Sequence, residues 1–338
     1  MTIEEQVPLA GLTTFKVGGP ARYVAMCRTE DDIRAALAFA RERSLPFFVL
    51  GQGSNILASD SGYAGVVIRI ALEGSEYVEL PGGAVEATYA AGESWEAFVT
   101  EAARRGLWGI ENLAGIPGTV GAAPIQNIGA YGADVAETIV RVNAVDARTG
   151  DLCTFTNEEC AFMYRESRFK QERDLIVTSV TFRLTKDGPS RLEYVDLVRV
   201  KEEGAALTNP QEIGDAVRAI RAKKFPDLSV EGTAGSFFKN PLIPKMQYDE
   251  LLERYPELPG YPAGEDIKIA LAYILDKVLG LKGHRFGSAR LYEAQPLVIA
   301  ASRAANAFDI DMLANEVRTR VMSASGIAIE REVRSMPD

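Results

Sequence analysis

The sequence predicts an α+β protein with more than one domain. Its 338 residues exceed the usual size of a single domain, so two or three packed units are expected. The chain can be separated by rhythm into three regions, and both helix-like and strand-like stretches occur along it. We therefore expect an α+β protein.

In the first region, residues 29–46 predict a helix and residues 47–50 a buried strand. Thr29 and Asp32 form a capping-box pattern at the start of this helix. Its apolar face consists of Ile33, Ala36, Leu37 and Ala40, which recur at helical spacing. The strand "FFVL" leads directly into a glycine turn.

The second and third regions contain the remaining predicted elements. The second has helices at 93–107 and 212–224 and strands of one sheet at 139–146, 152–156 and 175–185. The third has helices at 267–279 and 311–325, the latter ending at a C-cap glycine, Gly326. The last segment, 327–334, alternates, with Ile327, Ile329 and Val333 on one face and Glu330 and Glu332 on the other.

Composition and charge exclude several classes of protein. Hydrophobic residues make up 47% of the chain and charged residues 25%, as in ordinary globular proteins. No apolar run approaches the roughly 20 residues that span a bilayer. The acidic segment "MTIEEQVPLAGLTTF" does not resemble a secretion signal, so a cytoplasmic protein without membrane contact is expected. A net charge of -10 argues against binding to nucleic acid.

The cysteine and histidine content argues against a metal site. Cys27, Cys153 and Cys160 form no CxxC pair, and the single histidine, His284, cannot complete a metal site with them. We therefore expect buried thiols and no bound metal.

Two glycine-rich segments are candidates for a phosphate-binding site. In "LGQGSN", successive backbone N–H groups after a strand can form a nest for phosphate oxygens, although a plain hairpin turn stays possible. The stretch 109–132, "GIENLAGIPGTVGAAPIQNIGAYG", has six glycines and almost no charge, which neither a helix nor a central strand tolerates. Together they suggest one extended cofactor with a pyrophosphate; a strained structural loop is the alternative reading of the second segment.

A further motif, "GSFFKNP", raises the question of what Ser236 does. A nucleophilic serine normally needs a histidine base, and this chain has one histidine.

Several motifs, in order along nearly the whole chain, resemble one family. "TTFKVGGPA", "GQGSN", "IPGTVGAAPIQNIGAYG", "YRESRFK", "GSFFKNP", "LKG" and "EREVR" are similar to the UDP-N-acetylenolpyruvoylglucosamine reductases, MurB, of type I. The resemblance implies a vanillyl-alcohol-oxidase (PCMH) type FAD-binding fold, with lobes at 1–70 and 71–226 and an α+β substrate-binding domain at 227–338. It implies non-covalent FAD, NADPH as reductant, and a monomer.

The resemblance also implies the reaction. The enolpyruvyl ether of UDP-N-acetylglucosamine would receive a hydride and a proton, giving UDP-N-acetylmuramate for peptidoglycan. Ser236 would donate the proton and would therefore need no base. Arg165 and Glu332 would flank the substrate carboxylate. A surface salt bridge is the alternative reading of Arg165, and alternation alone cannot choose between Glu330 and Glu332.

The remaining site residues follow from the matching motifs. The cofactor-binding set is Gly51, Gly53, Ser54, Asn55, Ile116, Pro117, Gly118, Gly121, Ala122, Gln126, Asn127, Gly129, Ala130 and Tyr131. The substrate-binding set is Tyr164, Tyr194, Lys224, Asn240, Tyr261, Lys268, Lys282 and Gln295.

Two other functions stay open at the level of the sequence. Another FAD-dependent oxidase or dehydrogenase of the same fold could act on an alcohol or a sugar lactone, although it would need a base. A noncatalytic sugar-nucleotide-binding module that has lost its flavin is the second alternative.

Overall fold

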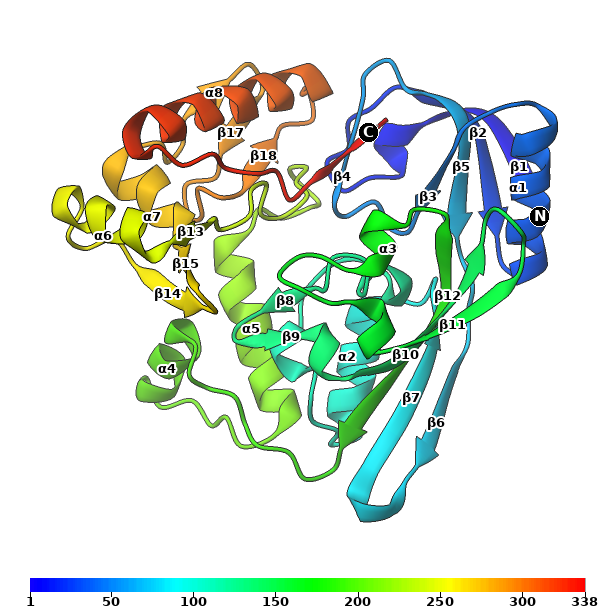
Figure 1. Cartoon of the computed structure of the whole chain (residues 1–338), viewed down its shortest axis with the longest axis horizontal. Helices are drawn as coiled ribbons and strands as arrows, with labels where there is room; N and C mark the ends of the chain where they lie inside the picture. Colours follow the sequence, from blue (N-terminus) through cyan, green and yellow to red (C-terminus); the bar gives the residue numbers. More distant parts are fainter. Residues whose placement is uncertain (338) are drawn as a thin grey trace. The chain divides into compact units, whose positions relative to one another are not determined.

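The computed structural model describes residues 1–337 and divides them into two compact units (Figure 1). The first unit comprises residues 1–7, 21–52 and 64–222, and the second comprises residues 8–20, 53–63 and the chain from Lys223 onward. Each unit has its own hydrophobic core. The boundaries that we expect after residues 70 and 226 stay predictions.

The first unit contains a four-stranded sheet and the predicted N-terminal helix. The strand order is β1-β2-β5-β3, with β1 at Thr2–Pro8, β2 at Pro20–Cys27, β5 at Tyr63–Ile70 and β3 at Phe47–Leu50. Helix α1, Glu30–Glu42, begins with the predicted capping box between Thr29 and Asp32. Its four predicted core residues are buried. This part of the prediction is confirmed.

A five-stranded antiparallel sheet forms the larger layer of the first unit. Its order is β11-β10-β12-β7-β6, with β11 at Leu152–Thr156, β10 at Ile139–Asp146, β12 at Leu175–Thr185, β7 at Ala84–Ala90 and β6 at Ser75–Glu79. The three strands predicted from residues 139–185 are confirmed within this one sheet. Figure 1 shows β6 and β7 as the outer hairpin of this sheet.

Besides α1, the helices of the first unit are α2, Trp95–Arg104; α3, Arg168–Gln171; α4, Val195–Glu202; and α5, Pro210–Lys224, of which the sequence predicts α2 and α5. Trp95 and Phe98 of α2 contact Phe182 of β12, with ring centroids 5.8 and 4.8 Å away, and all three side chains are fully buried. The predicted glycine-rich segment is irregular, apart from short 3-10 turns and the two-residue strands β8, Gly129–Ala130, and β9, Ala133–Asp134.

The second unit combines small sheets with three α-helices. Its sheets are β13-β15-β14 (Leu242–Pro244, Asp266–Ile269, Gly260–Ala263), β16-β17-β18 (Arg285–Phe286, Ala289–Leu291, Ile299–Ala301) and the parallel pair β19-β4 (Arg334–Met336, Ile56–Ala58). Its helices are α6, Lys245–Arg254; α7, Leu271–Tyr273, continued by a π-helix at Ile274–Val278; and α8, Ala307–Ser325.

The helix predicted over residues 267–279 is wrong in its first third. Residues 266–269 form β15, which is hydrogen-bonded to strands on both sides. Tertiary pairing therefore overrides the helical spacing of the apolar residues. The predicted end of α8 is confirmed, since Gly326 caps it with a φ of 70°.

Candidate active site

The two glycine-rich segments meet in the first unit. Gly51 follows β3 and lies against Thr119, so a Cβ at position 51 would be only 2.7 Å from the Thr119 hydroxyl oxygen. Gly121 packs in the same way on Ala91, where a side chain would overlap both the backbone and the Cβ of Ala91. A side chain at position 121 would overlap the backbone of Ala91, and one at position 51 would press on the Thr119 side chain, so both positions favour glycine.

Backbone donors in both segments are available to a ligand. Within residues 1–337, the N–H groups of Gln52, Gly53, Ser54 and Gly118 have no hydrogen-bond acceptor. Gly53 and Gly118 are buried. Because a buried N–H group without a partner is costly, such groups indicate that an acceptor is supplied from outside the chain. Backbone N–H groups of this kind, on Gly53 and Ser54 in the second unit and on Gly118 in the first, can each bind a phosphate oxygen.

A clamp of charged side chains holds the start of the second segment. The Gly115 N–H donates to Glu96 of α2 at 2.5 Å, and the Gly115 carbonyl accepts from Arg221 of α5 at 2.9 Å. Arg218 donates to the other oxygen of Glu96 at 2.5 Å. These contacts could not be predicted from the sequence, because nothing in an amphipathic helix distinguishes arginines that bind a distant loop from those on a solvated face.

The end of the second segment is fixed by its own polar side chains. Asn127 donates to the Met163 carbonyl at 3.1 Å and accepts from the Ala136 N–H at 3.0 Å. The ring of Tyr131 lies edge-on to Tyr194, with centroids 5.1 Å apart. Burial raises the pKa of Tyr131 to about 12. The amide of Asn127 is thus bound by the protein, so its contribution to a cofactor site is to shape the loop.

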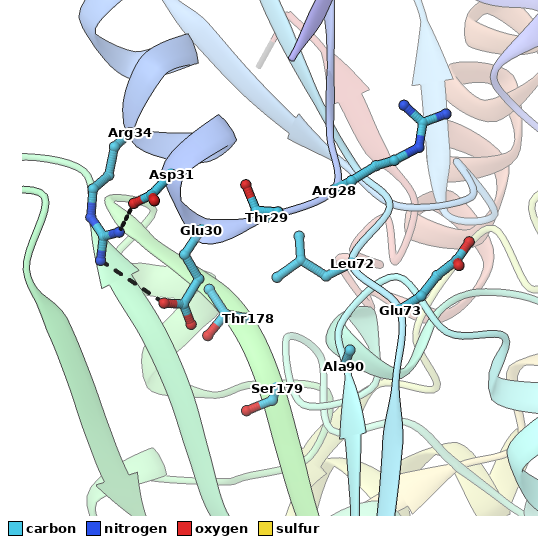
Figure 2. Close-up of a pocket in the computed structure, with 10 residues that line it drawn as sticks. All are labelled: Arg28, Thr29, Glu30, Asp31, Arg34, Leu72, Glu73, Ala90, Thr178 and Ser179. Carbon is cyan, nitrogen blue, oxygen red and sulfur yellow. Dashed lines mark hydrogen bonds and ion pairs between the residues drawn. The ribbon is translucent and has the colours of Figure 1, made fainter.

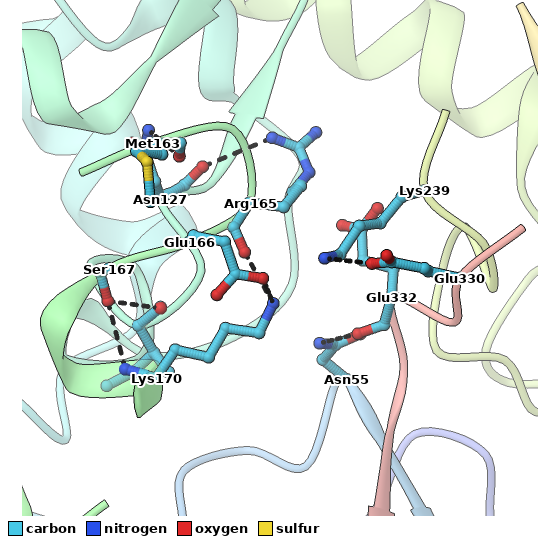
Figure 3. Close-up of polar contacts among 11 residues, drawn as sticks. Asn55, Asn127, Met163, Arg165, Glu166, Ser167, Lys170, Lys239, Glu330 and Glu332 are labelled. Carbon is cyan, nitrogen blue, oxygen red and sulfur yellow. Dashed lines mark hydrogen bonds and ion pairs between the residues drawn. The ribbon is translucent and has the colours of Figure 1, made fainter. Parts of the chain in front are cut away.

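Arg165 is held by the same loop (Figure 3). Its guanidinium donates to the Gly129 carbonyl at 2.6 Å and to the Asn127 carbonyl at 3.4 Å, and lies 3.8 Å from the Asp134 carboxylate. The Arg165 side chain is 16% exposed and that of Asp134 is 49% exposed, so the ion pair of the alternative reading is formed, with the guanidinium on its more buried side. The guanidinium is also 5.2 Å from the ring centroid of Tyr164.

In the second unit, Ser236 lies on a short paired segment. It forms a bridge with Val298 on one side, and the neighbouring Phe237 carbonyl accepts from the Glu332 N–H at 2.8 Å on the other. Within residues 1–337 the Ser236 hydroxyl has no hydrogen-bond partner. Ser236 is half-buried. The Ser236 hydroxyl is therefore available to donate a hydrogen bond to a ligand.

The Glu332 segment is anchored by backbone contacts. Asn55 donates its side-chain amide to the Glu332 carbonyl at 3.1 Å, as Figure 3 shows, and the Arg334 N–H donates to the Asn55 carbonyl at 3.1 Å. Glu330 is exposed and pairs with Lys239 at 3.0 Å, whereas Glu332 is half-buried. The two glutamates that alternation could not separate are thus in different surroundings.

The structure also places the other predicted substrate residues of the second unit. Tyr261 and Lys268 are directly opposite each other in the β14-β15 pair, so both side chains lie on one face. Gln295 precedes the segment that pairs with Ser236. Asn240 and Lys282 have protein partners: the Asn240 side chain accepts from the Leu271 N–H at 3.1 Å, and Lys282 pairs with Asp276 at 2.8 Å. Lys224 ends α5, as predicted.

A separate open hollow of about 450 Å³ lies beside the start of α1 (Figure 2). Arg34 on its rim pairs with Asp31 at 2.6 Å. The hydroxyl of Thr178, which lines it, is buried without a partner among residues 1–337. The hollow includes no predicted site residue.

The three cysteines are free thiols. Cys27 and Cys160 are buried, as predicted, and burial raises the pKa of each thiol to about 12. Cys153 is half-buried. Among residues 1–337, no helix is both long and apolar enough to cross a membrane.

Comparison with known proteins defines the class. Residues 21–156 match a family of FAD-binding domains, and residues 227–336 match the C-terminal domain of UDP-N-acetylenolpyruvoylglucosamine reductase. The chain is therefore a flavoprotein oxidoreductase with a PCMH-type FAD-binding domain.

Its relatives identify the family. The chain is 39% identical to the UDP-N-acetylenolpyruvoylglucosamine reductase of Pseudomonas aeruginosa and 40% identical to that of Chromobacterium violaceum; the alignments cover 98% and 96% of both proteins. A crystal structure of the Thermus caldophilus enzyme, MurB, superposes with a TM-score of 0.70 at 27% identity and 99% coverage of both chains. The chain belongs to the UDP-N-acetylenolpyruvoylglucosamine reductase family, which acts in the synthesis of peptidoglycan precursors.

Proposed function

We propose that this chain reduces the enolpyruvyl ether of UDP-N-acetylglucosamine to UDP-N-acetylmuramate, with Ser236 as the proton donor. The observation that carries the proposal is the Ser236 hydroxyl, which has no partner among residues 1–337 and lies on a segment hydrogen-bonded to that of Glu332. An unengaged hydroxyl beside a carboxyl-bearing segment suits a group that must give a proton to a bound substrate.

The residues of the glycine-rich segments fit FAD. The open backbone N–H groups of Gly53 and Ser54, and separately that of Gly118, are of the kind that binds phosphate oxygens, and Gly51 packs closely on Thr119 within the first unit. When bound, FAD supplies the hydride that it has received from NADPH.

Ser236 completes the addition across the alkene. Hydride addition to the terminal carbon of the enolpyruvyl group leaves negative charge on the neighbouring carbon and its carboxylate. The hydroxyl of Ser236 then transfers its proton to that neighbouring carbon. An alcohol is a weak acid, so this transfer requires surroundings that stabilise both the enolate-like intermediate and the developing alkoxide.

Arg165 and Glu332 provide those surroundings at the acid end of the substrate. The Arg165 guanidinium is permanently charged and can bind a carboxylate through paired hydrogen bonds. Glu332, half-buried, would meet the same carboxylate, where like-charge repulsion favours its protonated form. A protonated Glu332 would donate a hydrogen bond to the intermediate.

Finer properties of the enzyme belong to the same proposal. Tyr194 is 41% exposed at the start of α4 and would close over the diphosphate, as in the type I members that the sequence resembles. Lys224, Tyr261 and Lys268 would bind the anionic nucleotide.

We propose that the protein is cytoplasmic and monomeric. Sedimentation at the mass of one chain would support the monomer.

The experiment separates the two half-reactions. Ser236→Ala should leave the bleaching of bound FAD by NADPH unchanged, because that step requires no proton from Ser236. It should slow reoxidation by the enolpyruvyl substrate by about a hundredfold or more, the usual contribution of a general acid. Ser323→Ala, an exposed serine on α8, is the control. Equal loss of both half-reactions would contradict the proton-donor role.

A further inference from the structure

Arg165 occupies a turn position that normally takes glycine. Residues 163–166 form a tight turn: the Met163 N–H donates to the Glu166 carbonyl at 3.0 Å, and the Glu166 N–H donates to the Met163 carbonyl at 3.2 Å. Arg165 is the third residue of the turn and has a φ of 57°. A positive φ at this position favours glycine, as in type II turns. A long side chain kept there indicates that surrounding contacts stabilise the strained backbone for a purpose.

One of those contacts comes from Lys170 in helix α3, five residues after Arg165. Its ammonium donates to the Arg165 carbonyl at 2.7 Å and to the Glu166 carboxylate at 2.8 Å, as Figure 3 shows. The Lys170 side chain is 18% exposed, so solvent screens these bonds only in part. The bond to the carbonyl acts directly on the residue with the left-handed conformation.

The remainder of the loop is fixed without the ammonium. Ser167 donates to the Ile125 carbonyl at 2.6 Å, and Asn127 donates to the Met163 carbonyl at 3.1 Å. Phe169, at the centre of α3, is 2% exposed and packs in the core. Loss of the Lys170 charge should therefore leave the loop docked and affect chiefly the orientation of Arg165.

We propose that Lys170 is a positioning residue for Arg165. Its ammonium holds the Arg165 backbone in the conformation that presents the guanidinium to the substrate carboxylate. The inference rests on the proposed role of Arg165. Lys170 itself touches neither substrate nor cofactor in this account. Its effect should be confined to the half-reaction that involves the enolpyruvyl substrate.

The test is a double-mutant cycle on the flavin-loaded enzyme. Lys170→Met should leave the FAD dissociation constant and the rate of bleaching by NADPH unchanged. It should slow reoxidation by the enolpyruvyl substrate about tenfold, the loss expected for one hydrogen bond to a charged group. Lys170→Arg should restore most of that rate. In an Arg165→Met background, Lys170→Met should add less than about a twofold loss, because the group it positions is gone.

Controls separate this inference from the proposed function. Lys245→Met removes an i,i+4 ion pair with Asp249 of the same kind as that between Lys170 and Glu166, and should change neither half-reaction. Two results would overturn the positioning role. One is a tenfold loss from Lys170→Met that persists in the Arg165→Met background, so that the two losses multiply. The other is a tenfold loss that also appears in the bleaching step. If Arg165→Met alone leaves the rate of reoxidation unchanged, Arg165 does not bind the substrate carboxylate as proposed, and Lys170 has no group to position.

Discussion

At the scale of single residues, the role of Ser236 depends on which group accepts the proton of its hydroxyl. A serine that must lose its proton to a base needs a histidine, and His284 instead contacts Glu316 at 2.9 Å. A serine that gives its proton to a carbanion needs only a hydroxyl without a competing acceptor. The sequence indicates Ser236 as a candidate, but it does not show that this residue pairs with Val298, which is far away in the chain.

The same limit applies to the supporting residues. The contacts from Arg165 to Gly129, from Glu96 to Gly115 and from Asn55 to Glu332 join positions 36, 19 and 277 apart. Periodicity reports which face of an element is buried, not which distant carbonyl a side chain will reach.

Glu111 provides a prediction at this scale. Its carboxyl is 3% exposed and accepts from the Gly109 N–H at 2.6 Å, and burial raises its pKa. Because the pKa is higher in the folded than in the unfolded chain, the folded state holds the proton more tightly, and the stability contributed by this group falls as pH rises through the folded pKa. The free energy of unfolding of the wild type, relative to Glu111→Gln, should decrease between pH 4 and pH 7.

Urea unfolding at several pH values measures this difference. Glu257→Gln, at an exposed position, is the matched control and should show no comparable trend. A wild-type advantage over Glu111→Gln that grows with pH would contradict the assignment.

At the scale of elements, local rules predict helices well where capping and apolar spacing agree. α1 and α8 follow this pattern, with a capping box at Thr29 and a glycine cap at Gly326. Residues 266–269 show where these rules fail, because their apolar spacing suits a helix but β13 and β14 offer hydrogen bonds on both sides. Strand pairing depends on segments that the local sequence does not contain.

The glycine-rich loops give a prediction for an element. Gly51→Ala should weaken FAD binding by about tenfold or more, because the new methyl group would lie 2.7 Å from the hydroxyl oxygen of Thr119, which is buried, and the loop would have to shift. Fluorescence titration of the apoprotein with FAD measures the dissociation constant. Gly11→Ala, where a Cβ would meet no atom within 4 Å, is the control and should bind FAD as the wild type does. Unchanged affinity in Gly51→Ala would remove this loop from the cofactor site.

At the scale of the whole molecule, the sequence predicts the fold class and more than one unit, but not how the chain is shared between them. Residues 8–20 and 53–63 join the second unit, where Phe15 and Leu57 lie in its core. Phe15 packs edge-on to Phe237 with ring centroids 6.2 Å apart, and the Thr233 N–H donates to the Thr14 carbonyl at 3.1 Å. The sequences of these segments do not show which core they join, because their partners Phe237 and Thr233 are far away in the chain.

The chemistry proposed for the enzyme requires the hydroxyl of Ser236 to reach the carbon that becomes protonated. The most direct measurement is a crystal structure of the protein with FAD and the enolpyruvyl sugar nucleotide bound. We expect the Ser236 oxygen to lie within about 3.5 Å of the alkene carbon that bears the carboxylate, which is the separation expected for reacting atoms. A hydroxyl turned away from that carbon, with no water between them, would contradict it.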